Sequence, residues 1–248
     1  VFVDDNPSER ALIINEIPQV EVPVFPEQPY MLPVFLKEIA EHFFSVYSLT
    51  KEDLSKTAQY KTNALRNSSK IEYTNMEDYI RSLEIILKIE EASEITIPRI
   101  AQMTQKTNQF NLTTKRYSDT DIAGFVSQGY KIYTLSVSDK FGDNGITGTC
   151  IIKIDGNEAL FDSMLLSCRI LGKNIEFTFI EYVLSKLKSL GILFVTAHYI
   201  PTAKNEQVAE FYEKCGFICF ETTNLGVKLY RMNLSEKEIV ISDNYVIK

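Results

Sequence analysis

Cys168 and Arg169 stand next to each other where an apolar stretch, residues 159–168, comes to an end. This stretch predicts a strand, so both side chains lie at the strand's end. A thiolate is a strong nucleophile, and a neighbouring cation and a helix N-terminus favour the thiolate over the thiol. The other interpretation is a packing cysteine, because free cysteine is among the most buried residue types.

His198 lies near the end of a second predicted strand, residues 193–200. An unperturbed imidazole titrates near neutral pH, so His198 is a candidate base acting on Cys168 or on an incoming thiol. A histidine on a strand face is also often structural. The sequence leaves both interpretations open.

The segment Arg169-Ile170-Leu171-Gly172-Lys173-Asn174 connects the first of these strands to a predicted amphipathic helix over residues 174–190. A turn at this place directs backbone N–H groups and the positive end of the helix outward, an arrangement that binds anions. The candidate anion-binding residues are Arg169, Gly172, Lys173 and Asn174.

Periodicity and turn signals predict the elements that position these residues. Helices are expected over residues 7–16, 32–49, 50–67, 75–82, 97–109, 118–128, 174–190 and 205–214, and strands over 1–3, 20–25, 83–89, 130–138, 146–154, 159–168, 193–200, 217–222 and 227–233. Asn144-Gly145 is a strong hairpin signal and predicts a turn there. Asp119-Thr120-Asp121 opens a helix, so we interpret it as a cap. The pattern favours an α/β fold whose mixed sheet carries helices on both faces.

Composition narrows the function classes. The chain has 248 residues and a net charge of −7, which argues against a nucleic-acid binder with a globally basic surface. No apolar run approaches the roughly 20 residues of a membrane span. Four cysteines without a CxxC pair make a zinc site unexpected. Together with the lack of a signal-peptide pattern at Val1, they predict a cytoplasmic protein.

The order of elements, with an Arg-x-x-Gly turn after an apolar strand, resembles the GNAT acyltransferase fold, which has a mostly antiparallel central sheet. The resemblance implies that the 169–174 turn holds the phosphate of coenzyme A or of a carrier's phosphopantetheine. Asn174 stands where that fold usually has Gly or Ala, which predicts weak binding of coenzyme A. The segment 205–217, NEQVAEFYEKCGF, implies that Asn205 contacts the pantetheine arm and Tyr212 protonates the thiolate. The acyl thioester would lie in a gap between the strands ending at Cys168 and Ile200.

Four further motifs resemble the C-terminal half of the FkbH-like family: TQKTNQFNLTTKRY, DKFGDNGITG, LLSCRILGKNIE and YIPTAKN. Asp4-Asp5-Asn6-Pro7-Ser8-Glu9 resembles the last acidic motif of the haloacid dehalogenase (HAD) domain that precedes it. The resemblance implies a HAD remnant over 1–26, a helical linker over 27–82 and a GNAT-like domain over 83–248. Asp4 and Asp5 would bind Mg²⁺ only in an intact HAD domain.

This resemblance implies a small acyl group, which is glyceryl in that family, carried as a thioester on an acyl carrier protein for polyketide-type pathways. Four polar residues suit the hydroxyls of such a group: Asn108, Gln109, Asn111 and Thr113. Two other functions stay open. One is a non-catalytic docking module for the carrier protein, and the other is a coenzyme A-dependent N-acetyltransferase. No nucleic-acid or membrane partner is expected.

Overall fold

The computed structural model describes residues 1–44, 62, 66, 69, 73 and 75–248. The chain divides into two compact units, Val1–Leu49 and Thr50–Lys248. The predicted boundaries at 26/27 and 82/83 both differ from this division. The predicted helix over 50–67 lies largely outside the described residues, as does the end of the one over 32–49.

The first unit contains the helices α1 (Pro7–Glu16) and α2 (Leu32–Phe43) and the short 3-10 helix η1 (Pro29–Met31). α1 begins as predicted, because Asn6 accepts a hydrogen bond from the Ser8 N–H and Pro7 occupies the first turn. The predicted strands over 1–3 and 20–25 do not form. Their segments are joined by a backbone hydrogen bond of 2.9 Å from Phe2 to Glu21.

The second unit is built on a nine-stranded mixed sheet in the order β7-β8-β6-β5-β4-β3-β1-β9, with β2 paired to β5. Its strands are β1 (Ile86–Glu91), β2 (Phe110–Asn111), β3 (Lys131–Asp139), β4 (Gly142–Asp155), β5 (Glu158–Leu166), β6 (Phe194–Tyr199), β7 (Ile218–Thr222), β8 (Lys228–Asn233) and β9 (Val246–Ile247). The β5–β6 and β1–β9 pairs are parallel and the other pairs antiparallel, so the prediction of a mixed, mostly antiparallel sheet is confirmed.

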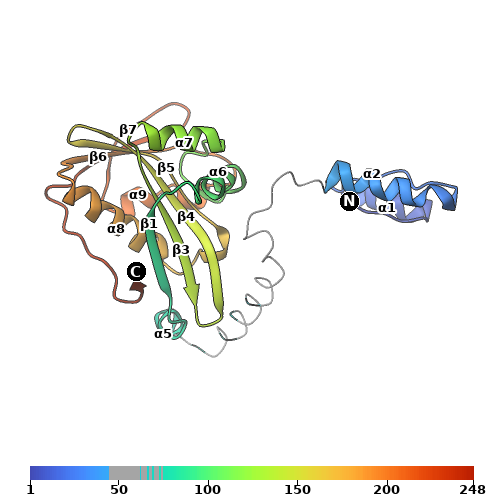
Figure 1. Ribbon diagram of the computed structural model, residues 1–248, viewed down its shortest axis with the longest axis horizontal. Helices are drawn as coiled ribbons and strands as arrows, with labels where there is room; N and C mark the ends of the chain where they lie inside the picture. The colour runs from blue at the N-terminus through green and yellow to red at the C-terminus, as the bar shows by residue number, and fades with distance from the viewer. Residues whose placement is uncertain (45–61, 63–65, 67–68, 70–72, 74) are drawn as a thin grey trace. The chain divides into compact units, whose positions relative to one another are not determined.

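Helices cover both faces of this sheet (Figure 1). They are α5 (Met76–Ser82), α6 (Ile97–Lys106), α7 (Asp119–Ser127), α8 (Ile175–Ser189) and α9 (Phe211–Lys214), with short 3-10 helices η2 (Cys168–Ile170) and η3 (Glu206–Val208). One core cluster joins α6 and α7 to β3 and β4, and a larger cluster packs α8 and α9 against the other face. Ser118 and Asp121 form a capping box at the start of α7, so the interpretation of Asp119-Thr120-Asp121 as a cap is confirmed.

The β3–β4 hairpin turns earlier than predicted. Asp139 pairs with Gly142, so the turn residues are Lys140 and Phe141, while Asn144 lies inside β4 and is buried. The Asp139 carboxylate accepts the backbone N–H groups of Phe141 (3.0 Å) and Gly142 (3.2 Å) and thereby organises the turn. The expected turn dipeptide instead sits where the β3–β4 register shifts.

Other predicted elements differ in extent. The helix expected over 205–214 is divided into η3 and α9. The C-terminal segment, for which the pattern predicted no element, returns to the far edge of the sheet as β9 beside β1. On the way, the Tyr245 hydroxyl donates a hydrogen bond to the Lys173 carbonyl oxygen. This contact ties the C-terminal segment to the 169–174 turn.

Candidate functional site

β2 occupies the gap that was expected to hold an acyl thioester. The parallel pairing of β5 and β6 ends at Phe161 and Ala197, and beyond these residues β2 lies against β5. Leu112 then bridges both sides, donating its N–H to Met164 (3.2 Å) and accepting from the Ile200 N–H (2.8 Å). Buried backbone groups of diverging strands need partners, and this segment supplies them. The structure therefore leaves no room for a thioester between the strands.

Asn205 holds this arrangement together. Its fully buried amide nitrogen donates to the carbonyl oxygens of Asn111 and Ile200, both at 2.9 Å. Its amide oxygen accepts from the Thr202 N–H (2.8 Å) and the Tyr199 hydroxyl (3.2 Å). All polar groups of the side chain are used internally, so the predicted contact of Asn205 with a pantetheine arm does not fit this geometry.

The four predicted substrate residues separate into two pairs. Asn111 and Thr113 are buried and bonded within the chain: the Asn111 amide donates to the Thr107 carbonyl (3.2 Å), and the Thr113 hydroxyl donates to the Asp162 carbonyl (3.1 Å). Asn108 and Gln109 line a pocket instead. The substrate role of Asn108 and Gln109 therefore stays a prediction, while the hydrogen bonds of Asn111 and Thr113 lie within the chain.

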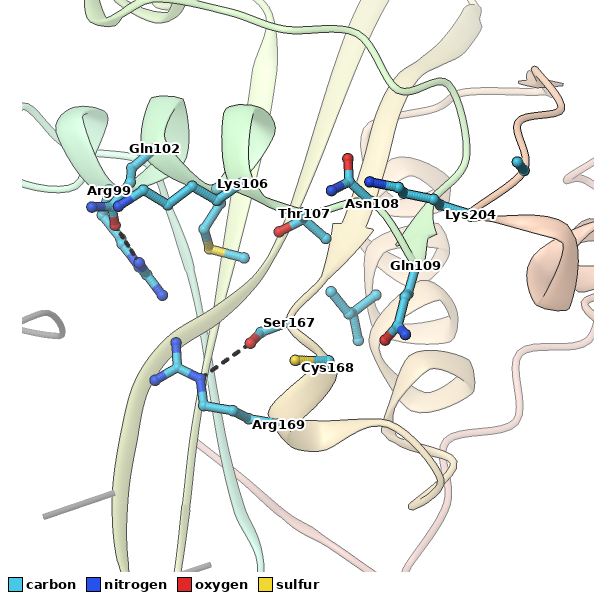
Figure 2. Close-up of a pocket in the computed structure, with 13 residues that line it drawn as sticks. Arg99, Gln102, Lys106, Thr107, Asn108, Gln109, Ser167, Cys168, Arg169 and Lys204 are labelled. Carbon is cyan, nitrogen blue, oxygen red and sulfur yellow. Dashed lines mark hydrogen bonds between the residues drawn. The ribbon is translucent and has the colours of Figure 1, made fainter. Parts of the chain in front are cut away.

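The pocket has a volume of about 740 Å³ and opens between α6, the segment before β2 and the end of β5. The exposed thiol of Cys168 lies in its wall, beside Ser167 and Arg169. Figure 2 shows these three residues on one side of the pocket and those of α6, with Asn108 and Lys204, on the other. The structure thus joins the predicted nucleophile to the predicted amides.

Four cationic side chains line this pocket, and among its described lining residues there is no carboxylate. They are Arg99, Lys106, Arg169 and Lys204. The Arg169 Nε donates to the Ser167 hydroxyl at 3.1 Å, and the Arg99 guanidinium donates to the Ile146 carbonyl at 3.0 and 3.2 Å. Such a set of fixed positive charges attracts an anionic group to the neighbourhood of the thiol.

Part of this site was missed by the sequence analysis. Arg99 and Lys106 come from α6. The polar residues of this helix recur at a spacing of three to four, which could have indicated that they share one face of the helix. Arg116 was also missed. Its guanidinium donates to the carbonyl oxygens of Thr104 and Thr107 and to the Asn108 side chain, so it fixes the end of α6 and orients Asn108.

His198 does not lie beside Cys168. Cys168 is seven residues beyond Phe161, and His198 one residue beyond its partner Ala197. β5 ends at Leu166, and at about 3.3 Å per residue this strand end already lies roughly 13 Å beyond the level of His198. Burial lowers the pKa of His198, and the positive charge of Lys115 lowers it further. The geometry does not support His198 as a base for this thiol.

Tyr212 lies in the core. Its ring packs against Phe161, Phe217 and Tyr230, and its buried hydroxyl has no hydrogen-bond partner among the described residues. Burial raises the pKa of this phenol well above its usual value. From this position the hydroxyl does not reach the pocket, so the geometry does not support the predicted proton transfer.

The 169–174 turn adopts an unusual backbone. Gly172 and Asn174 both have left-handed conformations, with φ of 77° and 58°. The Lys173 side chain is buried near Asp139 and Arg66 rather than exposed on the turn, and burial lowers its pKa. Lys173 was expected to bind an anion at this turn. Its inward position removes it from that role.

No family model and no curated protein sequence matches the chain. Solved structures similar to it include the ribosomal-protein-S18-alanine N-acetyltransferase from Escherichia coli (13% identity, 63% of this chain and 99% of that one, TM-score 0.47). An N-acetyltransferase from Staphylococcus aureus Mu50 is 14% identical, covering 60% and 98% of the two chains with a TM-score of 0.46. A GNAT-family acetyltransferase from Streptococcus pneumoniae is 13% identical, covering 59% and 98%, with a TM-score of 0.48. These similarities are too distant to assign an activity.

The class of fold is defined by the chain's own topology. Two antiparallel portions of the sheet meet at the parallel pair β5–β6. α8 connects these two strands, and β8 is inserted between β6 and β7. This is a mixed α/β fold with helices on both faces of the sheet (Figure 1), as the sequence predicted. In the part of the chain that the structure describes, no helix is long and apolar enough to span a membrane.

Proposed function

We propose that the second unit is an acyltransferase in which Cys168 receives a small acyl group from a thioester and passes it to the thiol of an acyl carrier protein. The observation that carries this proposal is the exposed Cys168 thiol in a cationic pocket with Asn108 and Gln109. Amide side chains suit a hydroxylated acyl group, whose hydroxyls need hydrogen-bond partners once enclosed. The FkbH-like motifs support glyceryl as that group and a polyketide-type pathway as its destination.

The two steps balance without any other reactant. The Cys168 thiolate attacks the carbonyl carbon of the donor thioester, the donor's C–S bond breaks, and the departing thiolate takes a proton from water. The carrier thiol gives its proton to the hydroxide that this step leaves, and its thiolate attacks the carbonyl carbon of the Cys168 thioester. The Cys168 C–S bond breaks, and Cys168 leaves as a thiolate. Arg169 and the other pocket cations line the same pocket as the thiol and would stabilise the negative charge that develops on the carbonyl oxygen.

The direct test is to mix the protein with a glyceryl thioester of N-acetylcysteamine and a phosphopantetheinylated carrier, and to follow the carrier by intact-mass measurement. The proposal requires a glyceryl adduct on the carrier that forms faster with the protein than without it. Equal rates with and without the protein would contradict it.

A docking module that binds the carrier protein without catalysis is the second candidate. It is favoured by the positions of His198 and Tyr212, neither of which lies at the Cys168 thiol. A plain coenzyme A-dependent N-acetyltransferase is less well supported, because β2 fills the gap between β5 and β6.

The HAD portion belongs to the same proposal. Residues 1–26 would be the tail of such a domain, and Asp4 and Asp5 would be its Mg²⁺ ligands. The Asp4 carboxylate accepts a hydrogen bond from the Asn6 N–H at 2.8 Å, and no group of three or more metal-binding side chains gathers anywhere among the described residues. The residues present here do not fit a magnesium site, so no step is assigned to the metal.

Carrier docking is expected to depend on Lys106 and Lys204, two exposed lysines at the pocket. Acyl carrier proteins are acidic, and this chain is acidic overall, so a local positive surface must steer them together. The Lys106→Glu/Lys204→Glu double variant should bind the carrier roughly tenfold more weakly at low salt, mainly through slower association. Surface plasmon resonance at two salt concentrations measures both effects.

The matched control is Lys153→Glu, which reverses an exposed charge on β4 away from the pocket. Its carrier affinity should equal that of the unmodified protein. If the double variant keeps both its affinity and its salt dependence, the carrier docks elsewhere.

A further inference from the structure

A second groove, of about 290 Å³, lies at the N-terminal end of α8 and is separate from the Cys168 pocket. Gly172 and Asn174 of the turn, Glu176 of α8 and Lys214 of α9 are among the residues that line it. In the GNAT-like fold this turn and helix end were expected to hold the phosphate of coenzyme A. The side chains around this turn and helix end determine whether a phosphate can bind there.

Glu176 places a carboxylate in the first turn of α8. Its Oε2 atom is buried and has no hydrogen-bond partner among the described residues. A negative side chain in the first turn compensates the positive end of a helix, which is the same interaction that a bound phosphate would make. Burial raises the pKa of the Glu176 carboxyl, and in its ionised form this group compensates the helix end in the place where a phosphate would bind.

The nearby cations that could balance the negative charge of Glu176 make other contacts or line the other pocket. Lys173 is buried beside Asp139 and Arg66, and Arg169 lines the other pocket. Lys214 is the one cation among the described residues that line the groove, and it forms an ion pair with Glu210 at 3.7 Å. A diphosphate in this groove would thus meet a carboxylate with little compensating positive charge.

We propose that Glu176 is a specificity-determining residue that excludes coenzyme A from the end of α8, so that the domain takes acyl groups from thioesters that lack a nucleotide diphosphate. The inference deepens the proposed acyl transfer and rests on it. Four cations line the Cys168 pocket, whereas Lys214 is the one cation among the described residues that line the groove at the helix end. Anionic groups of the partner bind at the Cys168 pocket, on the α6 side of the sheet.

The test compares coenzyme A binding to the full chain and to its Glu176→Gln variant by calorimetry. The substitution keeps the shape of the side chain and removes its charge, so the variant should bind coenzyme A roughly tenfold more tightly. Glu94→Gln, an exposed charge between β1 and α6, is the matched control and should change nothing. Equal affinities for the unmodified protein and Glu176→Gln would overturn the inference.

Asn174→Gly provides a second variant that does not depend on the first. It removes the side chain that narrows the turn, and glycine adopts the left-handed backbone of that position readily. The inference requires coenzyme A to remain weakly bound to Asn174→Gly, because Glu176 is still present. A tenfold gain in Asn174→Gly would show that size, not charge, excludes the ligand, and would overturn it.

The same proteins separate this inference from the proposed function. Acylation of Cys168 by a glyceryl N-acetylcysteamine thioester, followed by intact-mass measurement, should proceed equally in the unmodified protein and in Glu176→Gln. If neither protein is acylated while Glu176→Gln gains coenzyme A affinity, the acyl transfer is wrong and the groove's selectivity is a binding property alone. If both are acylated and neither differs in coenzyme A affinity, the role of Glu176 is wrong.

Discussion

Replacing Cys168 with alanine should abolish the acyl-enzyme and lower glyceryl transfer to a carrier protein by on the order of 10³-fold. The thiol is the proposed nucleophile and is exposed in the cationic pocket, and alanine removes it without adding bulk. Intact-mass measurement after mixing with a glyceryl thioester shows the adduct, and carrier loading gives the rate.

Cys219→Ala is the matched control, because Cys219 is also an exposed free cysteine, whereas Cys150 and Cys215 are buried. This variant should be acylated and should load the carrier at the unmodified rate. Retained loading by Cys168→Ala would contradict a covalent role for the thiol and would favour the docking module.

Asn205→Ala should lower the free energy of unfolding by about 3 kcal/mol, since it removes a buried amide and leaves several buried partners unpaired. The lost contacts join the Asn111 and Ile200 carbonyl oxygens and the Thr202 N–H. They connect β2 to the end of β6 across the diverging strands. Urea unfolding followed by circular dichroism measures the change.

Lys204→Ala is the control for Asn205→Ala. It changes the neighbouring exposed residue and should alter the stability by no more than about 0.5 kcal/mol. If Asn205→Ala keeps full stability but loses affinity for the carrier's arm, Asn205 is a ligand-binding residue, as the GNAT resemblance implied. Its internal hydrogen bonds would then contribute little to the stability of the fold.

Much of the fold could be predicted because its signals are local. Apolar periodicity identified β3, β5, β6, α7 and α8 to within a few residues. The errors occurred at elements whose position is determined by tertiary contacts. The β3–β4 turn is set by the Asp139 carboxylate, which binds two backbone N–H groups, and not by Asn144-Gly145. β9 has two residues and exists only because β1 offers it an edge.

The candidate site, like the fold, has features that the sequence predicts and features that only tertiary contacts determine. Cys168, Arg169, Asn108 and Gln109 could be predicted, because their types and their place at element ends were visible in the sequence. The direction of a side chain was not visible. Lys173 turns inward, and Asn205 and Tyr212 are enclosed by the core. A motif that matches by position therefore does not show whether its polar atoms reach a ligand.

The central claim is that Cys168 carries the acyl group, and peptide mapping tests it most directly. The protein is mixed with a glyceryl thioester, quenched in acid and digested, and each cysteine-containing peptide is analysed by tandem mass spectrometry. We predict a hydroxylamine-labile glyceryl group on Cys168 and none on Cys219, which is also exposed. A glyceryl group spread over both residues, or absent from Cys168 while the carrier is still loaded, would contradict the account.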